Sequence, residues 1–462
     1  MLTIGQAIAQ LARMANQVRK QVLKGGPQAV VAALVGVPAL LAFAQAIRSA
    51  LTNQVELHWN GHDARSRFLV NSSPALATYN PPFWMGGDLQ TLWGVKLRPA
   101  PERPIQFTRR YLHLADGGMI ALDWLSTWQP GQPVLLLLHG LTGGSQENYI
   151  QHIADVASEH GYCVVVQTAR GCNETELVTA KGFSACWTAD VRATTRYLRR
   201  MVGVETPFFA AGVSLGGSIL ARFLVEEGSA CTLQGAALLC PSLDMHKSSK
   251  LLNTPLNRLT YNRVLAGSLG RYAKRHESTL KLVPAIPFEQ AVNASTVHEF
   301  DAAVVVPSFG FEDVEHYYCE ATTGPLLECH VGVPTLIAHA ADDPICCPTA
   351  IPKDAPAANP NIVVAMTATG GHVAWLQGMW PQGRSWVDEP LAQFFDAIQE
   401  WNKKPEAQEY HLRSRTGVPL SDFSDTVHAS NGPHGEEHLA AVEAESPLPS
   451  AGDAAAQKAA EA

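Results

Sequence analysis

The sequence predicts an α/β fold in which a mostly parallel sheet is covered by helices on both faces. Between residues 73 and 403, short apolar runs rich in leucine and β-branched residues alternate with segments of helical periodicity. Continuous apolar runs are typical of strands buried on both faces, and their alternation with helices is typical of a parallel sheet. Residues 241–331 interrupt this alternation, so we expect them to form a cap over the sheet.

The expected elements follow one another regularly along this body. The first strand, 133–138, contains one valine and four consecutive leucines, and it leads to a helix over 146–160 that Gly161 ends. The other expected strands are 162–168, 207–213, 233–240, 334–339 and 362–368, and the other expected helices are 187–201, 214–227 and 386–401.

One motif within this series predicts a nucleophile. Residues 212–217 read Gly-Val-Ser-Leu-Gly-Gly, a G-x-S-x-G match centred on Ser214. Such a match is common by chance, but here an apolar strand precedes the serine and a helix follows it. That context is typical of the sharp strand-to-helix turn that exposes a nucleophilic hydroxyl, and the helix N-terminus favours developing negative charge. We therefore interpret Ser214 as a nucleophile rather than as part of a structural turn.

A nucleophilic serine needs a base, and the base needs a carboxylate that fixes its tautomer. After this type of turn the two follow in the chain order acid, then histidine. His372 stands in a Gly-Gly-His turn after the last expected strand, which predicts the base. Asp343 follows the preceding strand and comes directly before a proline, which predicts the acid. Its neighbour Asp342, and Asp244 after the strand 233–240, are the alternatives.

The loop after the first strand predicts part of an oxyanion hole. Residues 139–144 read His-Gly-Leu-Thr-Gly-Gly. In this arrangement one backbone N–H comes from this loop and the other from the residue after the nucleophile. We predict the N–H groups of Leu141 and Leu215. His139 precedes the nucleophile, so we interpret it as a side chain that shapes the loop and not as the base.

No metal site, cofactor site or nucleic-acid surface is predicted. The 17 histidines contain no H-E-x-x-H motif, the nine cysteines contain no C-x-x-C pair, and neither a G-x-G-x-x-G nor a phosphate-loop motif occurs. No basic run with interleaved aromatic residues favours nucleic acid. His58 and Asp63 form an H-x(4)-D string known from acyltransferases, which we interpret as a coincidence upstream of the folded body.

Both ends of the chain differ in composition from the body. Residues 1–55 hold five basic residues, no acidic residue and an apolar run over 29–44, which approaches the ~20 residues of a membrane-spanning helix. They predict a membrane anchor, either a single-pass helix or an interfacial helix, with an organellar transit peptide as the alternative. Residues 404–462 are acidic and poor in aromatic residues, which predicts a disordered tail.

Several motifs in a fixed order resemble the membrane-anchored branch of the α/β-hydrolase domain-containing family, with its members 1 and 3 and related plant and bacterial esterases. The resemblance covers residues 81–401. The matching segments are PPFWMGGDLQTLW (81–93), DGGMIALDW (116–124), HGLTGGSQENY (139–149), ARGC (169–172), GVSLGG (212–217), EFD (299–301), GFEDVEHYY (310–318), AADDPI (340–345) and GGHVAW (370–375).

This resemblance implies an α/β-hydrolase fold, an N-terminal membrane anchor and a catalytic triad of Ser214, Asp343 and His372. It also implies hydrolysis of lipid esters or of simple short- or medium-chain acyl esters, with no cofactor. Acyl transfer to an alcohol through the same acyl-enzyme is the alternative activity. A binding module without activity is the alternative that is not an enzyme.

Overall fold

The computed structural model describes residues 54–82, 84–379, 381 and 383–407, together with residues 13, 15–20, 23 and 36. Almost all of the expected anchor (1–55) and of the expected acidic tail (404–462) lies outside these described residues. Within the described ranges, no helix combines the length and the apolar character needed to cross a membrane.

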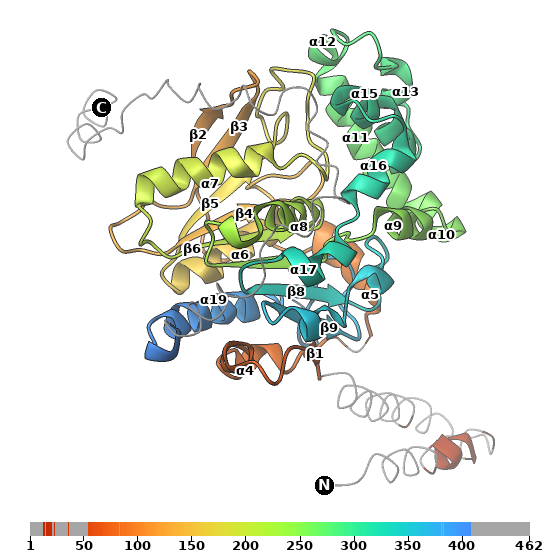
Figure 1. The fold of residues 1–462 in the computed structure, drawn as a ribbon. Helices are drawn as coiled ribbons and strands as arrows, with labels where there is room; N and C mark the ends of the chain where they lie inside the picture. Colours follow the sequence, from red (N-terminus) through yellow and green to blue (C-terminus); the bar gives the residue numbers. More distant parts are fainter. Residues whose placement is uncertain are drawn as a thin grey trace, which may run out of the picture.

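The described residues form a nine-stranded sheet in the order β1-β9-β8-β7-β6-β4-β5-β3-β2 (Figure 1). Strands β4 to β9 are parallel, whereas β1, β2 and β3 join antiparallel at the two edges. The strands are β1 (Glu56–His58), β2 (Thr108–His113), β3 (Met119–Trp124), β4 (Val134–Leu138), β5 (Cys163–Thr168), β6 (Phe208–Val213), β7 (Gly235–Leu239), β8 (Thr335–Ala340) and β9 (Ile362–Thr367). The prediction of a mostly parallel α/β sheet is confirmed, and the six expected strands correspond to β4 to β9.

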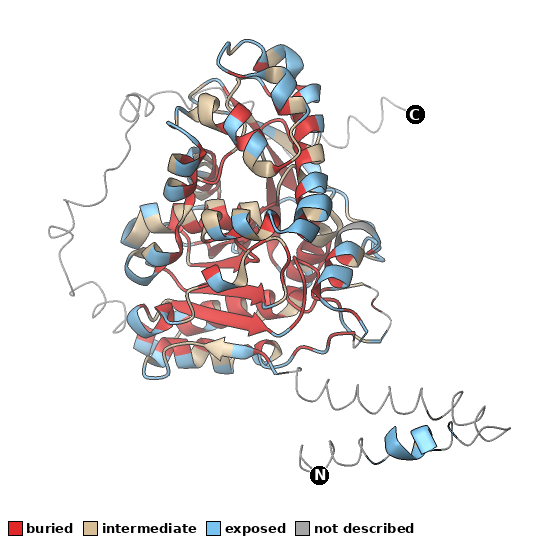
Figure 2. Ribbon diagram, turned by 90° about the vertical axis from the view of Figure 1, so that its right-hand side faces the viewer, coloured by how far each residue is buried: buried red, intermediate tan, exposed pale blue. Residues whose placement is uncertain are grey.

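Helices cover the sheet on both faces because successive side chains of a strand point to opposite sides. Leu135 and Leu137 of β4 belong to one apolar core, which also holds residues of α6 (Asn148–Glu159) and α19 (Asp388–Asn402). Leu136, between them, belongs to a second core with residues of α7 (Ala189–Val202) and α8 (Leu215–Glu227). In Figure 2 the central strands are accordingly red, and the outer faces of the helices are largely pale blue.

Folded elements are already present before residue 73, the expected start of the body. Strand β1 pairs with β9, and α4 (Ala64–Asn71) packs against α19 and buries Leu69. Asp63 caps α4 by accepting a hydrogen bond from the Ser66 N–H (2.7 Å). A strand of three residues, half exposed, has too little periodicity to be recognised from the sequence.

The helices between β7 and β8 lie within residues 241–331, the expected cap. Figure 1 shows most of them grouped to one side of the sheet, whereas α17 (Leu327–His330) packs against α8. The cap helices supply most of a separate apolar core, to which Leu269, Tyr272 and Phe300 belong together with Cys172 and Leu177 from the segment after β5. The cap elements are α9 (Met245–Leu252), α10 (Pro255–Asn257), η4 (Arg258–Asn262), α11 (Arg263–Arg275), α12 (Glu277–Leu280), α13 (Phe288–Val292), α14 (Val297–Phe300), η5 (Asp301–Val305), α15 (Val306–Phe309), α16 (Val314–Ala321), η6 (Gly324–Leu326) and α17 (Leu327–His330). Helix α5 (Gly87–Lys96) precedes the main sheet strands, and the other elements between residues 54 and 407 are η2 (Pro74–Leu76), η3 (Gly228–Ala230), η7 (Pro348–Ala350) and α18 (Ala355–Ala358).

A buried carboxyl in the cap predicts a pH-dependent stability. Asp301 is buried and accepts a hydrogen bond from the Tyr318 hydroxyl (2.9 Å), and burial raises its pKa to about 7. This folded-state pKa lies above the unfolded value, so the protonated carboxyl is favoured in the folded protein. The contribution of Asp301 to the free energy of unfolding is therefore full below pH ~4 and is lost as the pH rises to ~7, a decrease on the order of 4 kcal/mol at most. In Asp301→Asn, the thermal midpoint should therefore fall less between pH 5 and pH 8 than in wild type.

Glu299→Gln, which changes an exposed carboxyl two residues away, is the matched control and should keep the wild-type pH dependence. An Asp301→Asn protein whose thermal midpoint follows the wild-type pH dependence would contradict this account.

Candidate active site

Ser214 lies in the turn between β6 and α8, in a strained backbone conformation. Its φ is 55°, and its N–H donates to the Leu239 carbonyl of β7 (2.8 Å). A Cβ added to Gly212 would lie 2.3 Å from the Gly216 oxygen, and one added to Gly216 would lie 2.4 Å from the Leu138 oxygen. The two glycines of the motif are therefore required by the close approach of the turn to its own helix and to β4.

The imidazole of His372 lies between Ser214 and Asp343. Its Nε2 is 2.9 Å from Ser214 Oγ, and its Nδ1 is 2.8 Å from Asp343 Oδ2. The backbone N–H of His372 donates to Thr91 Oγ1 of α5 (2.8 Å), which fixes the turn that carries the ring. In the neutral ring, Nδ1–H donates to the carboxylate and Nε2 accepts the serine hydroxyl, which is the arrangement of a general base.

The carboxylate of Asp343 is buried, and both of its oxygens accept hydrogen bonds. Its Oδ1 accepts the N–H groups of Ile345 (2.8 Å) and Cys346 (2.9 Å). Burial acts to raise its pKa, but the adjacent His372 and His339 rings and these amides hold the pKa below its ordinary value. Asp343 is therefore ionised at neutral pH, as a group that orients an imidazole must be.

The two alternative aspartates have other partners. Asp342 Oδ1 accepts the N–H of Gly371 (2.9 Å), so this side chain supports the turn before His372. Asp244 is the N-cap of α9 and accepts the N–H of Lys247 (2.9 Å). Of the three aspartates, only Asp343 has a hydrogen bond to the His372 ring.

One of the two predicted oxyanion-hole residues directly follows Ser214, and the other lies in the loop after β4. Leu215 is the first residue of α8, so its N–H has no acceptor within the helix. Leu141 lies in the loop after β4, where a Cβ added to the preceding Gly140 would be 3.4 Å from Ser214 Cβ. This loop therefore runs past the serine.

Two side chains hold that loop in place. The Tyr149 hydroxyl accepts the N–H of Gly140 (2.8 Å). His139 Nδ1 donates to the Gly140 carbonyl (2.6 Å), and its Nε2 accepts the N–H of Ala169 (3.0 Å). Burial lowers the pKa of His139, so the ring is neutral and both nitrogens are used by the backbone. These contacts agree with the interpretation of His139 as a loop-shaping residue.

Several supporting residues were not predicted from the sequence. Asp123 of β3 accepts hydrogen bonds from Ser145 of the loop (2.7 Å) and from Arg109 (2.6 and 2.7 Å). The motifs of the family resemblance contain all of these supporting residues: Thr91, Asp123, Ser145 and Tyr149. Membership in those motifs was the signal in the sequence that could have pointed to them. Their contacts join segments far apart in the chain, so no local pattern identified their roles.

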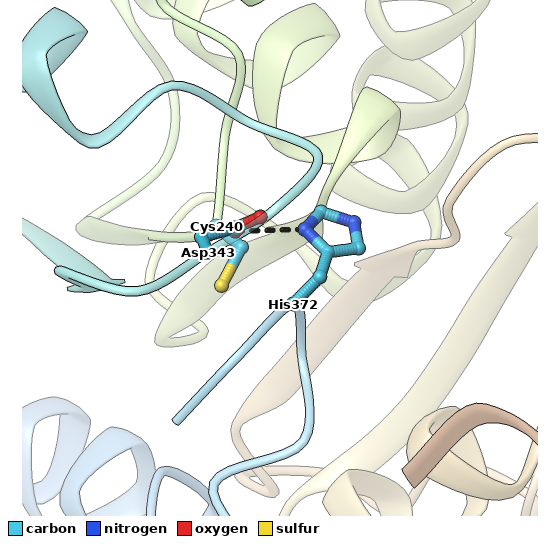
Figure 3. A group of neighbouring side chains, drawn as sticks. All are labelled: Cys240, Asp343 and His372. Atoms are coloured by element: carbon cyan, nitrogen blue, oxygen red, sulfur yellow. Dashed lines mark hydrogen bonds and ion pairs between the residues drawn. The ribbon is translucent and has the colours of Figure 1, made fainter. Parts of the chain in front are cut away.

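Within the described residues, one group of side chains is close enough to share a metal ion: Cys240, Asp343 and His372, whose ligand atoms lie within 4.8 Å of one another (Figure 3). Burial and the neighbouring Asp343 carboxylate raise the pKa of the Cys240 thiol well above its ordinary value. A thiol must lose its proton to bind a metal, and the other two groups are bonded to each other. The set therefore fits a triad with a packed thiol better than it fits a metal site.

A serine on a strand-to-helix turn of a parallel sheet, beside a histidine held by a buried aspartate, defines a serine hydrolase of the α/β-hydrolase fold. Comparison with known proteins agrees with this class. The chain is 34% identical to phospholipase ABHD3 of Mus musculus over 351 aligned residues, and this alignment covers 74% of this chain and 84% of that protein. The chain therefore belongs to the α/β-hydrolase domain-containing family, and the predicted family is confirmed.

Two yeast proteins are further relatives. Monoacylglycerol lipase of Saccharomyces cerevisiae is 31% identical over 301 residues (63% of this chain, 66% of that protein). Medium-chain fatty acid ethyl ester synthase/esterase 2 of the same organism is 26% identical over 392 residues (69% of this chain, 85% of that protein). No family model matches the chain. The protein is a serine ester hydrolase that acts on lipid or acyl esters, as the sequence predicted.

Proposed function

We propose that Ser214, His372 and Asp343 are the catalytic triad and that the chain cleaves the carboxylic ester of a phospholipid or acylglycerol. The observation that carries this proposal is the position of one imidazole, 2.9 Å from Ser214 Oγ and 2.8 Å from Asp343 Oδ2. The names of the relatives, a phospholipase and a monoacylglycerol lipase, support the substrate class.

The reaction proceeds in two steps. Ser214 Oγ forms a bond to the ester carbonyl carbon while His372 Nε2 takes the hydroxyl proton, and the alcohol leaves with that proton. Water then attacks the acyl-enzyme, gives its proton to His372 and releases the acid, and Ser214 recovers its hydroxyl hydrogen. In both steps the N–H groups of Leu141 and Leu215 stabilise the negative oxygen of the tetrahedral intermediate.

Labelling with a fluorophosphonate probe tests the nucleophile. The wild-type protein should be labelled at Ser214, because the probe reacts with an activated serine hydroxyl. Ser214→Ala should not be labelled. The control is Ser218→Ala, which changes a buried serine of α8 and should still be labelled at Ser214. Labelling at another serine, or no labelling of the wild type, would contradict the assignment.

Acyl transfer is the second candidate function. One relative carries both synthase and esterase in its name, and the same acyl-enzyme can pass its acyl group to an alcohol instead of water. A competition between water and glycerol or lysophospholipid acceptors separates the two. A new ester as the main product would show a transferase.

We also propose that residues 1–55 place the enzyme on a membrane, with organellar import after removal of a transit peptide as the alternative. The basic flank and the apolar run over 29–44 support this proposal. The backbone N–H of Val55 donates to the Ala77 carbonyl (3.1 Å), so a deletion should end before β1.

Deletion of residues 1–50 should leave turnover of a soluble short-chain ester within about twofold of wild type, because the triad lies elsewhere in the fold. It should release the protein from the membrane fraction and lower its activity on a vesicle-borne lipid ester. A full-length protein that stays in the soluble fraction, or that is recovered shortened inside an organelle, would contradict the anchor.

A further inference from the structure

The cap is divided into a basic half and an acidic half. Residues 245–288 contain eight lysines and arginines and one acidic residue, whereas residues 289–331 contain eight acidic residues and no lysine or arginine. All eight basic side chains are exposed. Only Lys247 and Lys281 form ion pairs, so in the part of the chain that the structure describes six exposed cations have no carboxylate partner.

Apolar side chains share the exposed face of the helical run from 255 to 275, which comprises α10, η4 and α11. Leu256, Leu259 and Val264 are 65%, 75% and 56% exposed, although each is large and aliphatic. Arg263, Arg271 and Lys274 continue the same side at helical spacing, and the opposite side buries residues such as Leu269 and Ala273 in the cap core. We call these six exposed residues (Leu256, Leu259, Arg263, Val264, Arg271 and Lys274) the cap-rim face.

The cap-rim face begins at the edge of the active site. Asn257, next to Leu256, donates from Nδ2 to the carbonyl of Pro344 (3.0 Å), the residue after Asp343. Tyr261 donates its hydroxyl hydrogen to Asp88 Oδ1 (2.8 Å), and Asp88 is in α5, the helix whose Thr91 holds His372. The helical run is therefore fastened at one point to the loop that carries Asp343 and at a second point to α5, which supports the turn of His372.

Helix α5 extends this apolar rim. Its Leu89 and Leu92, one helical turn apart, are 48% and 55% exposed. Exposed aliphatic residues thus lie on two neighbouring elements at the same edge of the site, beside unpaired cations. Figure 2 shows the pale-blue outer faces of the cap helices on this side of the molecule.

We propose that the cap-rim face docks on the surface of a lipid bilayer that contains anionic lipids. Leucines and basic residues on one exposed helical face suit a membrane interface. The leucines enter the acyl boundary, and the cations contact lipid phosphates. The face borders the active site, so docking would bring the site to the bilayer that holds the ester. This last step rests on the proposed lipid-ester function, whereas the docking itself does not.

The test uses the full-length proteins and the same proteins without residues 1–50, because the proposed anchor would hold every full-length sample on both kinds of vesicle. The vesicle outcomes below refer to the shortened proteins. Co-sedimentation is measured with vesicles of phosphatidylcholine alone and of phosphatidylcholine with phosphatidylserine. Turnover is measured on a fluorogenic phospholipid in each vesicle and on a soluble short-chain ester. The wild type should bind and turn over substrate better on the anionic vesicles, and high salt should remove this advantage.

The variant Arg263→Ala/Arg271→Ala/Lys274→Ala should lose most of the anionic advantage. Each basic residue near an anionic surface is worth roughly fivefold in binding, so the loss should be on the order of 100-fold. Leu256→Ser/Leu259→Ser should bind both kinds of vesicle more weakly. Both variants should keep wild-type turnover of the soluble ester, because none of these residues touches the proposed triad.

Controls lie in α7 and two residues after its end, and Figure 1 shows α7 on the other side of the molecule from α10. Arg196→Ala/Arg200→Ala removes two exposed cations without ion pairs, and Val204→Ser removes an aliphatic residue that is 75% exposed, as Leu259 is. Both controls should behave as wild type. The proposal is overturned if the wild type has no preference for anionic vesicles or if the triple variant keeps that preference. It is also overturned if a control loses as much vesicle binding as the cap-rim variants.

One further outcome would assign the face to a different partner. If the triple variant changes the sedimentation of the free protein and not its vesicle binding, the basic half of the cap contacts the acidic half of a second copy, and the membrane proposal is overturned. Absence of soluble-ester turnover in the wild type would count against the proposed function alone, because vesicle binding is measured without turnover.

Discussion

Ser214→Ala should lower kcat for a soluble ester by about 10⁶-fold, and His372→Ala should lower it by a similar factor. The reason is that the two side chains act as one unit, in which Nε2 of the histidine activates Oγ at 2.9 Å. The loss in kcat is measured from initial rates with a chromogenic short-chain ester. Each variant must have an unchanged circular dichroism spectrum.

The double variant Ser214→Ala/His372→Ala is the decisive control. Because loss of either residue already abolishes the activated hydroxyl, the double variant should be no slower than the single variants by more than a few fold. A double variant that is much slower than both would show that the two residues act independently, and the triad assignment would fail.

Asp343→Asn should lower kcat by about 10⁴-fold. The asparagine can donate a hydrogen bond where the carboxylate accepted one, so it favours the ring tautomer in which Nδ1 lacks its proton and Nε2 carries it. That tautomer has no acceptor for the Ser214 hydroxyl. Measurement of kcat and KM on the soluble ester checks this, and KM should change little because the loss is in the chemical step.

Asp342→Asn and Asp244→Asn are the matched controls for that substitution. An asparagine at 342 can still accept the Gly371 N–H, and an asparagine at 244 is still a good helix cap, so each should retain kcat within about tenfold. A larger loss at either position than at Asp343 would overturn the choice of acid.

Patterns in the sequence were enough to predict the order of the main strands and helices and to identify the proposed nucleophile and base. Those predictions depend on short-range patterns: a run such as VLLLL predicts a strand buried on both faces, and strand, G-x-S-x-G and helix follow one another within about twenty residues. The resemblance in several ordered motifs determined the family in the same way. Each of these signals is carried by residues that are neighbours in the chain.

Contacts between distant segments could be identified only in the folded protein. Asp342 and Asp343 are adjacent and chemically identical, and the turn after β8 aims only Asp343 at His372, 29 residues further on. Thr91 supports the same histidine across 281 residues, and the edge strand β1 is recognisable only by its pairing with β9. A pattern in the sequence reports how a segment folds locally. Which side chains meet is set by the packing of the whole sheet, since a hydrogen bond depends on positions in space and not on separation along the chain.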